Sequence, residues 1–126
     1  MLIKMKSILL VDDDKQLATI FQSALTAAGY QVRVVNDGTS GIDAAKEQKF
    51  DLILLDEMMP DMSGNDVLKA LKSDDQVKAI PVAMLTNFGS NDLIKDALDS
   101  GAADYILKYQ VSPTDLPAKI KGIIGE

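Results

Sequence analysis

The chain has 126 residues, of which 47% are hydrophobic and 25% charged, and this composition predicts a single globular domain over residues 1–126. It contains no cysteine and no histidine, which excludes disulfides, thiolate or imidazole metal ligands, and histidine-based catalysis. The net charge of −6 argues against direct binding to nucleic acid, because such binding draws on a basic surface. No apolar stretch is long enough for a membrane span and the start lacks a signal-peptide core, so we expect a cytoplasmic location.

The first half of the chain alternates apolar runs with segments of helical spacing. Residues 7–11 predict a buried strand, and apolar residues then recur at helical spacing over 17–28. Gly29 is placed to end this helix as its C′ residue, because glycine readily takes a positive φ. A short strand over 32–35 and a helix over 39–48 are predicted next.

The second half continues this alternation. A buried strand is predicted over 51–55, a loop over 60–64 and a helix over 67–71. Another buried strand over 80–85 and a helix over 90–100 follow.

The last predicted strand covers 105–107. Ser112 then has the features of a helix N-cap, with Pro113 at N1 and Asp115 at N3, and apolar positions continue this helix to Ile124. Strands separated by helices on short connections imply right-handed crossovers and a parallel sheet covered on both faces. The predicted fold class is therefore α/β, a flavodoxin-like (βα)5 doubly wound sheet of five parallel strands in the order 2-1-3-4-5.

Four acids directly follow two of the apolar runs. Asp12, Asp13 and Asp14 come after the first strand, and Asp56 comes after the strand at 51–55. In the predicted order these two strands are neighbours and end at the same edge of the sheet. Burying an ionised carboxylate is costly unless a cation or hydrogen bonds compensate, so acids at both strand ends indicate one shared site. Converging carboxylate oxygens suit a hard divalent cation such as magnesium.

Short motifs lie at the ends of the predicted strands. They are Ile8-Leu9-Leu10-Val11-Asp12-Asp13, Leu54-Leu55-Asp56 with Met59-Pro60 and Gly64, Leu85-Thr86, Tyr105, and Lys108. Taken together, in this order and at this spacing, they resemble the receiver domain of bacterial response regulators. The resemblance extends over essentially the whole chain.

The resemblance implies that Asp56 is the phosphoacceptor, whose carboxylate attacks a phosphoryl group and becomes an acyl phosphate. Lys108 would pair with the phosphoryl oxygens. The resemblance also implies Mg2+ as cofactor. Its ligands would be Asp12, Asp13, Asp56 and the backbone carbonyl of Met58.

The same resemblance implies a switch. Thr86 would donate its hydroxyl to the phosphoryl group, and Tyr105 would change rotamer as Thr86 is drawn inward. A histidine kinase or a histidine phosphotransfer protein would supply the phosphoryl group to a signalling domain that is not a turnover enzyme. The face formed by the fourth helix, fifth strand and fifth helix would bind a downstream protein or output domain, or a second copy of the phosphorylated chain. Candidate surface positions there are Asp92, Lys95, Asp99, Ala103 and Lys119.

Each assignment has an alternative that needs no phosphoryl chemistry. Asp14 is better explained as the N-cap of the first helix than as a metal ligand. Thr86 could satisfy a backbone group at its strand end, and Tyr105 could be a packing residue with its hydroxyl in solvent. Lys108, taken singly, could be a solvated surface lysine.

Several positions depart from the family pattern. Tyr109 stands where a proline in a cis peptide is common, so this peptide is expected either to be trans or to sustain a strained bond. Met58 and Phe88 are apolar at positions that influence loss of the phosphoryl group, and we expect them to hinder the hydrolytic water and prolong the phosphoaspartate. Glu57 adds a negative charge beside the phosphoacceptor and is expected to face solvent.

Two other functions compete with the phosphorylated switch. One is a receiver that binds partners without phosphorylation, with Tyr109, Asn87 and Glu57 as its signs, but the complete set of acids, threonine and lysine argues against it. The other is a phosphoaspartate hydrolase of the haloacid dehalogenase type. Such enzymes place a second acid two residues beyond the nucleophile, where this chain has Met58, so this function is disfavoured.

Overall fold

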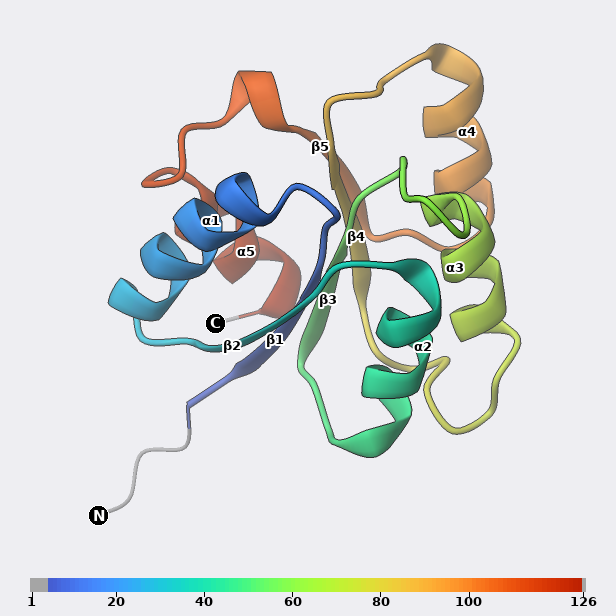
Figure 1. The fold of residues 1–126 in the computed structure, drawn as a ribbon, viewed down its shortest axis with the longest axis horizontal. Coiled ribbons are helices and arrows are strands. Elements are labelled where there is room, and N and C mark those ends of the chain that lie inside the picture. Colours follow the sequence, from blue (N-terminus) through green and yellow to red (C-terminus); the bar gives the residue numbers. More distant parts are fainter. Residues whose placement is uncertain (1–4, 126) are drawn as a thin grey trace.

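A computed structural model describes residues 5–125 and shows a five-stranded parallel sheet with helices on both sides (Figure 1). The strand order is β2-β1-β3-β4-β5, which confirms the predicted fold class. Within residues 5–125, no helix is both long and apolar enough to cross a membrane. The elements are β1 (Ser7–Val11), α1 (Lys15–Ala27), β2 (Gln31–Val35), α2 (Gly38–Glu47), β3 (Leu52–Leu55), α3 (Gly64–Lys72), β4 (Val82–Thr86), α4 (Asn91–Asp99), β5 (Asp104–Leu107), the 3-10 helix η1 (Lys108–Gln110) and α5 (Leu116–Ile124).

The sheet separates two apolar layers, which explains why its central strands are almost continuously apolar. Side chains alternate between the two faces of a strand, so Ile8 and Leu10 pack in one layer, whereas Leu9 and Val11 pack in the other. Helices α1 and α5 cover the first layer, and α2, α3 and α4 cover the second (Figure 1). Residues that directly follow these strands therefore begin in the interior of the protein.

Strands β1 and β3 are neighbours, as predicted, and they end at the same level. They pair in parallel with Val11 opposite Leu55. The backbone N–H of Asp56 continues this pairing by donating to the carbonyl of Val11 at 2.9 Å. Asp12 directly follows the last residue of β1, so Asp12 and Asp56 lie beside each other at the carboxyl edge of the sheet.

Local sequence sets the ends of α1 and α4 as predicted. Asp14 caps α1, because its side chain accepts a hydrogen bond from the N–H of Leu17 at 3.1 Å. Gly29 follows α1 with a φ of 100°, and Gly101 follows α4 with a φ of 105°. This left-handed conformation favours glycine, which has no Cβ to clash with the backbone.

The predicted start of the last helix was wrong. Ser112 is not its N-cap; the carbonyl of Ser112 accepts hydrogen bonds in a turn, and α5 begins at Leu116. A helix with Pro113 at N1 would place Pro117 in its interior, where the ring clashes with the carbonyl four residues earlier. With its start at the buried Leu116, the helix holds Pro117 in its first turn, where a missing N–H is tolerated.

Gly64 begins α3 where the fold leaves no room for a side chain. A Cβ at this position would lie 2.2 Å from the backbone oxygen of Asp56 and 2.8 Å from the Cα of Glu57. Because backbone atoms cannot swing away, we expect Gly64→Ala to lower the free energy of unfolding by about 1–3 kcal/mol. Urea denaturation measures this change.

Gly122 in α5 provides the matched control for this substitution. A Cβ at Gly122 would meet no heavy atom within 4 Å. Alanine also has the higher helix propensity, so Gly122→Ala should raise the free energy of unfolding by up to about 1 kcal/mol. Equal stability of the two variants would contradict the steric explanation.

Candidate functional site

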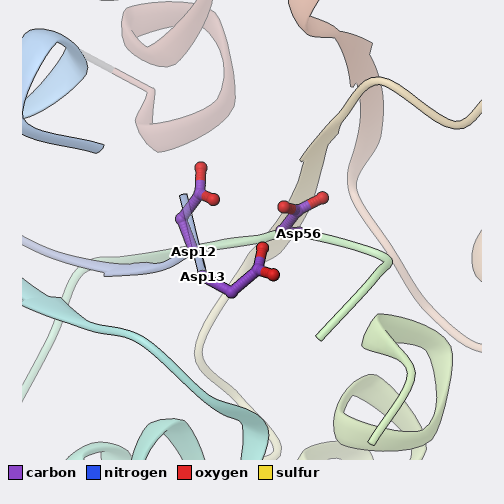
Figure 2. Close-up of side chains that lie close together, drawn as sticks. All are labelled: Asp12, Asp13 and Asp56. Carbon is purple, nitrogen blue, oxygen red and sulfur yellow. The ribbon is translucent and has the colours of Figure 1, made fainter. Parts of the chain in front are cut away.

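Three carboxylates meet at the carboxyl edge of the sheet. Asp12 and Asp13 follow β1 and Asp56 follows β3, and one carboxylate oxygen from each lies within 4.8 Å of the others (Figure 2). Asp12 is 0% exposed and Asp56 is 5% exposed, whereas Asp13 is exposed to solvent. The cluster is therefore open to water on the side of Asp13 and buried elsewhere.

Lys108 brings a positive charge to this edge from the opposite half of the sheet. Its Nζ lies 2.7 Å from Oδ2 of Asp12 and 3.3 Å from Oδ2 of Asp56. The residue opens η1, directly after β5, and its side chain is buried. The alternative that Lys108 is a solvated surface lysine is therefore wrong. One ammonium is paired with two of the three carboxylates in the cluster, so the cluster keeps a net negative charge when all three acids are ionised.

Burial dominates the protonation of Asp12. Desolvation raises the pKa of Asp12 to about 6, although the hydrogen bond and the charge of Lys108 act in the opposite direction. The N–H of Asp14 also donates to Oδ1 of Asp12, at 3.0 Å. On the other strand, the N–H of Glu57 donates to Oδ1 of Asp56 at 2.7 Å. In both Asp12 and Asp56, one carboxylate oxygen thus accepts a hydrogen bond from a backbone N–H and the other contacts Lys108.

The residues at this edge fit a magnesium ion. Carboxylate oxygens are the hard ligands that Mg2+ prefers, and the chain has no histidine or cysteine to favour a softer metal. A single ammonium does not neutralise the three acids, so a divalent cation would offset the remaining charge.

Thr86 and Tyr105 both hold the loop between β4 and α4 at one residue, Phe88. The N–H of Phe88 donates to Oγ1 of Thr86 at 3.2 Å, and the hydroxyl of Tyr105 donates to the carbonyl of Phe88. Thr86 thus satisfies a backbone group, as its alternative role predicted. The alternative role of Tyr105 left its hydroxyl to solvent, whereas in the structure this hydroxyl bonds a backbone carbonyl at an exposed position. Burial, with smaller effects from Glu57 and Asp56, raises the pKa of Tyr105 to about 12.

Glu57 is buried, so the expectation that it faces solvent is wrong. It is 2% exposed rather than solvent-facing, because the start of α3 covers it, and the N–H of Asn65 donates to its Oε1 at 3.1 Å. Desolvation raises the pKa of Glu57. Asn65, also buried, was missed entirely. The available signal was its helical spacing of three residues from the core position Leu68.

The segments that follow β3, β4 and β5 expose large side chains around this edge. Met58 is 54% exposed, Phe88 46% and Tyr109 67%. No peptide bond within residues 5–125 is cis, so the bond before Tyr109 is trans. Lys108 nevertheless points at the acids, with Nζ 2.7 Å from Asp12 and 3.3 Å from Asp56.

Comparison with models of protein families matches residues 8–121 to the response regulator receiver domain. The chain belongs to this family. Among curated relatives, this receiver domain is 39% identical over 114 residues to the DNA-binding response regulator MtrA of Mycolicibacterium paratuberculosis. The match covers 90% of this chain and 49% of MtrA, so the receiver domain spans about half the length of that relative.

Solved receiver structures share the fold. A CheY-like receiver domain protein from Methanospirillum hungatei JF-1 superposes with a TM-score of 0.90 at 30% identity, covering 97% of this chain and 95% of that one. The receiver domain of the sensor histidine kinase PA1611 from Pseudomonas aeruginosa PAO1 gives a TM-score of 0.86 at 26% identity, covering 98% and 100%. The PA1611 structure has a magnesium ion coordinated in its active site cleft.

Removal of Lys108 should leave two buried carboxylates without their cation. We expect Lys108→Met to lower the free energy of unfolding at about pH 7.5 by about 3–5 kcal/mol. The pKa of Asp12 in the folded protein, about 6 with the lysine in place, should rise further above its unfolded value of about 4. Because Asp12 has a higher pKa in the folded than in the unfolded protein, protonation of Asp12 stabilises the folded protein. This stabilisation is fully present below the unfolded pKa of Asp12 and is lost as the pH rises through its folded pKa. The deficit of the variant should therefore shrink toward about pH 5.

Urea denaturation at both pH values, without divalent cations, measures this deficit. Lys95→Met is the control, because Lys95 pairs with the exposed Asp99, at 2.6 Å, and exposed pairs contribute little. A deficit for Lys108→Met that is the same at both pH values would contradict the burial of unpaired carboxylates.

Proposed function

We propose that this receiver domain accepts a phosphoryl group on Asp56 with the help of Mg2+ and thereby changes its binding to partners. The main support is the convergence of three carboxylates from two strand ends, two of which share one buried ammonium, with Nζ of Lys108 2.7 Å from Asp12 and 3.3 Å from Asp56. A lone acid after a strand would be an ordinary loop residue. A desolvated anionic cluster, by contrast, is stable only with added cations and suits a phosphoryl group that arrives together with a metal.

Asp56 would act as the nucleophile. One of its carboxylate oxygens attacks the phosphorus in line with the bond to the donor, that bond breaks with its electron pair going to the donor, and an acyl phosphate remains. Lys108 then pairs with the phosphoryl oxygens from the side of β5. Thr86 accepts a hydrogen bond from Phe88 and so keeps its hydroxyl hydrogen, which it donates to the phosphoryl group.

The proposed magnesium ligands are Asp12, Asp13, Asp56 and the backbone carbonyl of Met58. When bound, the ion would offset the repulsion between the attacking carboxylate and the phosphoryl oxygens. Asp12 ligates only as a carboxylate, so its raised pKa makes metal binding weaker as the pH falls toward about 6.

The phosphoryl donor would be a phosphohistidine on a histidine kinase or a histidine phosphotransfer protein, because this chain has no histidine of its own. Met58, Phe88 and Tyr109 follow β3, β4 and β5 at the carboxyl edge of the sheet, and all are exposed. Exposed apolar side chains gathered at one edge suit contact with a protein donor.

The phosphorylated domain would act by binding rather than by turnover. Its candidate partner surface consists of α4, β5 and α5, which would take up a downstream protein, an output domain or a second copy of the chain. A phosphorylation-independent receiver is not favoured, because Lys108 is in contact with both buried acids and Thr86 is in place. The sequence-derived surface positions are all exposed, namely Asp92, Lys95, Asp99, Ala103 and Lys119.

Intact-mass measurement after incubation with acetyl phosphate tests the phosphoacceptor. We expect the mass of one phosphoryl group to be added only when magnesium is present, and we expect Asp56→Asn to abolish the addition. Asp75→Asn is the matched control, because the side chain of Asp75 is 93% exposed and pairs with Lys78 in the connection between α3 and β4, away from the cluster. A folded protein that gains no mass with magnesium present would instead support phosphorylation-independent binding.

The lifetime of the phosphoaspartate tests the role of Met58. A thioether cannot orient a hydrolytic water well, whereas an amide can, so Met58→Asn should speed the loss of the phosphoryl group severalfold. Ile20→Asn makes the same kind of change on α1, where Ile20 is 50% exposed, and should leave the rate unchanged. Fast decay in the unaltered protein that Met58→Asn does not accelerate would refute the proposed protection.

A further inference from the structure

A chain of buried polar groups leads from the phosphoacceptor loop to α4, and the proposed chemistry does not use it. Glu57 is 2% exposed and Asn65 is 4% exposed. Oε2 of Glu57 and Oδ1 of Asn65 have no hydrogen-bond partner within residues 5–125. Buried polar atoms without partners cost free energy, and an apolar pair would fill the same space at lower cost. A role in function would account for keeping this pair.

The first link joins Asp56 to the start of α3 through Glu57. The N–H of Glu57 donates to Oδ1 of Asp56 at 2.7 Å, and its Oε1 accepts from the N–H of Asn65 at 3.1 Å. The carbonyl of Glu57 also accepts from the N–H of Gly64, at 2.7 Å. Both the backbone and the side chain of Glu57 therefore hold the phosphoacceptor against the N-terminus of α3.

The second link joins α3 to the middle of α4 through the side chain of Asn65. Its Nδ2 donates to Oδ2 of Asp96 at 2.8 Å and to the carbonyl of Leu93 at 3.3 Å. Asp96 is also paired with Lys69 of α3, at 3.1 Å, but that pair lies at the surface. Asn65 is thus the buried connection between the two helices.

Helix α4 has few other contacts that would hold it in place. Ala97 is its one buried residue, and the large side chain of Leu98 is 47% exposed. Helices that bury little apolar surface open at low free-energy cost. The hydrogen bonds from Asn65 therefore contribute a larger share of the docking of α4 than such bonds would in a well-packed helix.

We propose that Asn65 is a positioning residue that couples the phosphoryl group on Asp56 to the placement of α4. This inference rests on the proposed function of Asp56. When an acyl phosphate forms, Asp56 keeps one carbonyl oxygen in place of a carboxylate, and additional negative charge arrives beside the buried Glu57. Glu57 is held at only one of its two side-chain oxygens, so it shifts readily and carries the change to the N–H of Asn65.

This route is separate from that of Thr86 and Tyr105. Those two residues hold Phe88, which lies in the loop before α4. Asn65 instead attaches to Leu93 and Asp96, which lie within the helix itself. The two routes can therefore be cut independently.

Hydrogen exchange of residues 91–99, with and without magnesium and beryllofluoride as a phosphoryl mimic, tests this coupling. In the unaltered protein the mimic should change the α4 exchange rates by about fivefold or more, as typical couplings between sites do. Asn65→Ala should reduce this ratio to less than about twofold while residues next to Asp56 still respond. Asp96→Ala, at a half-exposed position that the fold tolerates, should reduce the ratio in the same way.

Lys69→Ala is the matched control, because it removes the surface ion pair of Asp96 and leaves the bond from Asn65. It should keep the full ratio. If Asn65 has a purely structural role, Asn65→Ala would raise α4 exchange equally with and without the mimic and leave the ratio of the two rates unchanged. This outcome would overturn the inference about Asn65 and leave the proposed function standing. No response to the mimic anywhere in the unaltered protein would overturn the proposed function, and the inference with it.

Discussion

The parallel pairing of β1 with β3 is the constraint on which the rest of this structure depends. Both strands are buried on both faces and end at the same level, so Asp12 and Asp56 are drawn out of water together. Two carboxylates cannot remain ionised in such a place without a cation, and Lys108 supplies one from the end of β5. The carboxyl edge of the sheet thus carries three carboxylates but one ammonium. The proposed magnesium binding and phosphoryl transfer follow from this excess of negative charge.

The same edge explains why neighbouring loops are held so closely. Gly64 must lack a side chain because α3 starts directly against the backbone of Asp56. The loop after β4 is held at both backbone groups of Phe88, by Thr86 and by Tyr105. A change of charge at Asp56 would therefore act on closely packed backbone on the sides of α3 and of the loop after β4, whereas the side of Asp13 is open to water.

Helix α4 is the element best suited to respond. It buries a single residue, whereas α3 beside it buries Gly64, Asn65, Val67, Leu68 and Leu71. A weakly packed helix can exchange between positions at a small cost in free energy. The hydrogen bonds that hold it then decide which position is preferred. In this receiver domain the hydrogen bonds run from Asp56, the proposed phosphoacceptor, through Glu57 and Asn65 to α4, which belongs to the surface proposed for partners.

The sequence by itself determined the features that depend on near neighbours and on the alternation of apolar segments. The strand order and the meeting of Asp12 with Asp56 were predictable from the alternation of strands and helices, and the cap at Asp14 was predictable because helix caps act locally. The start of α5 was also present in the sequence, in the spacing of Pro117, but was overlooked. Only the tertiary structure decided that Glu57 is buried against the start of α3, where the N–H of Asn65 donates to it, and that Asn65 reaches Asp96 across 31 residues of chain. Burial of a polar side chain depends on what packs over it, and no local pattern records that.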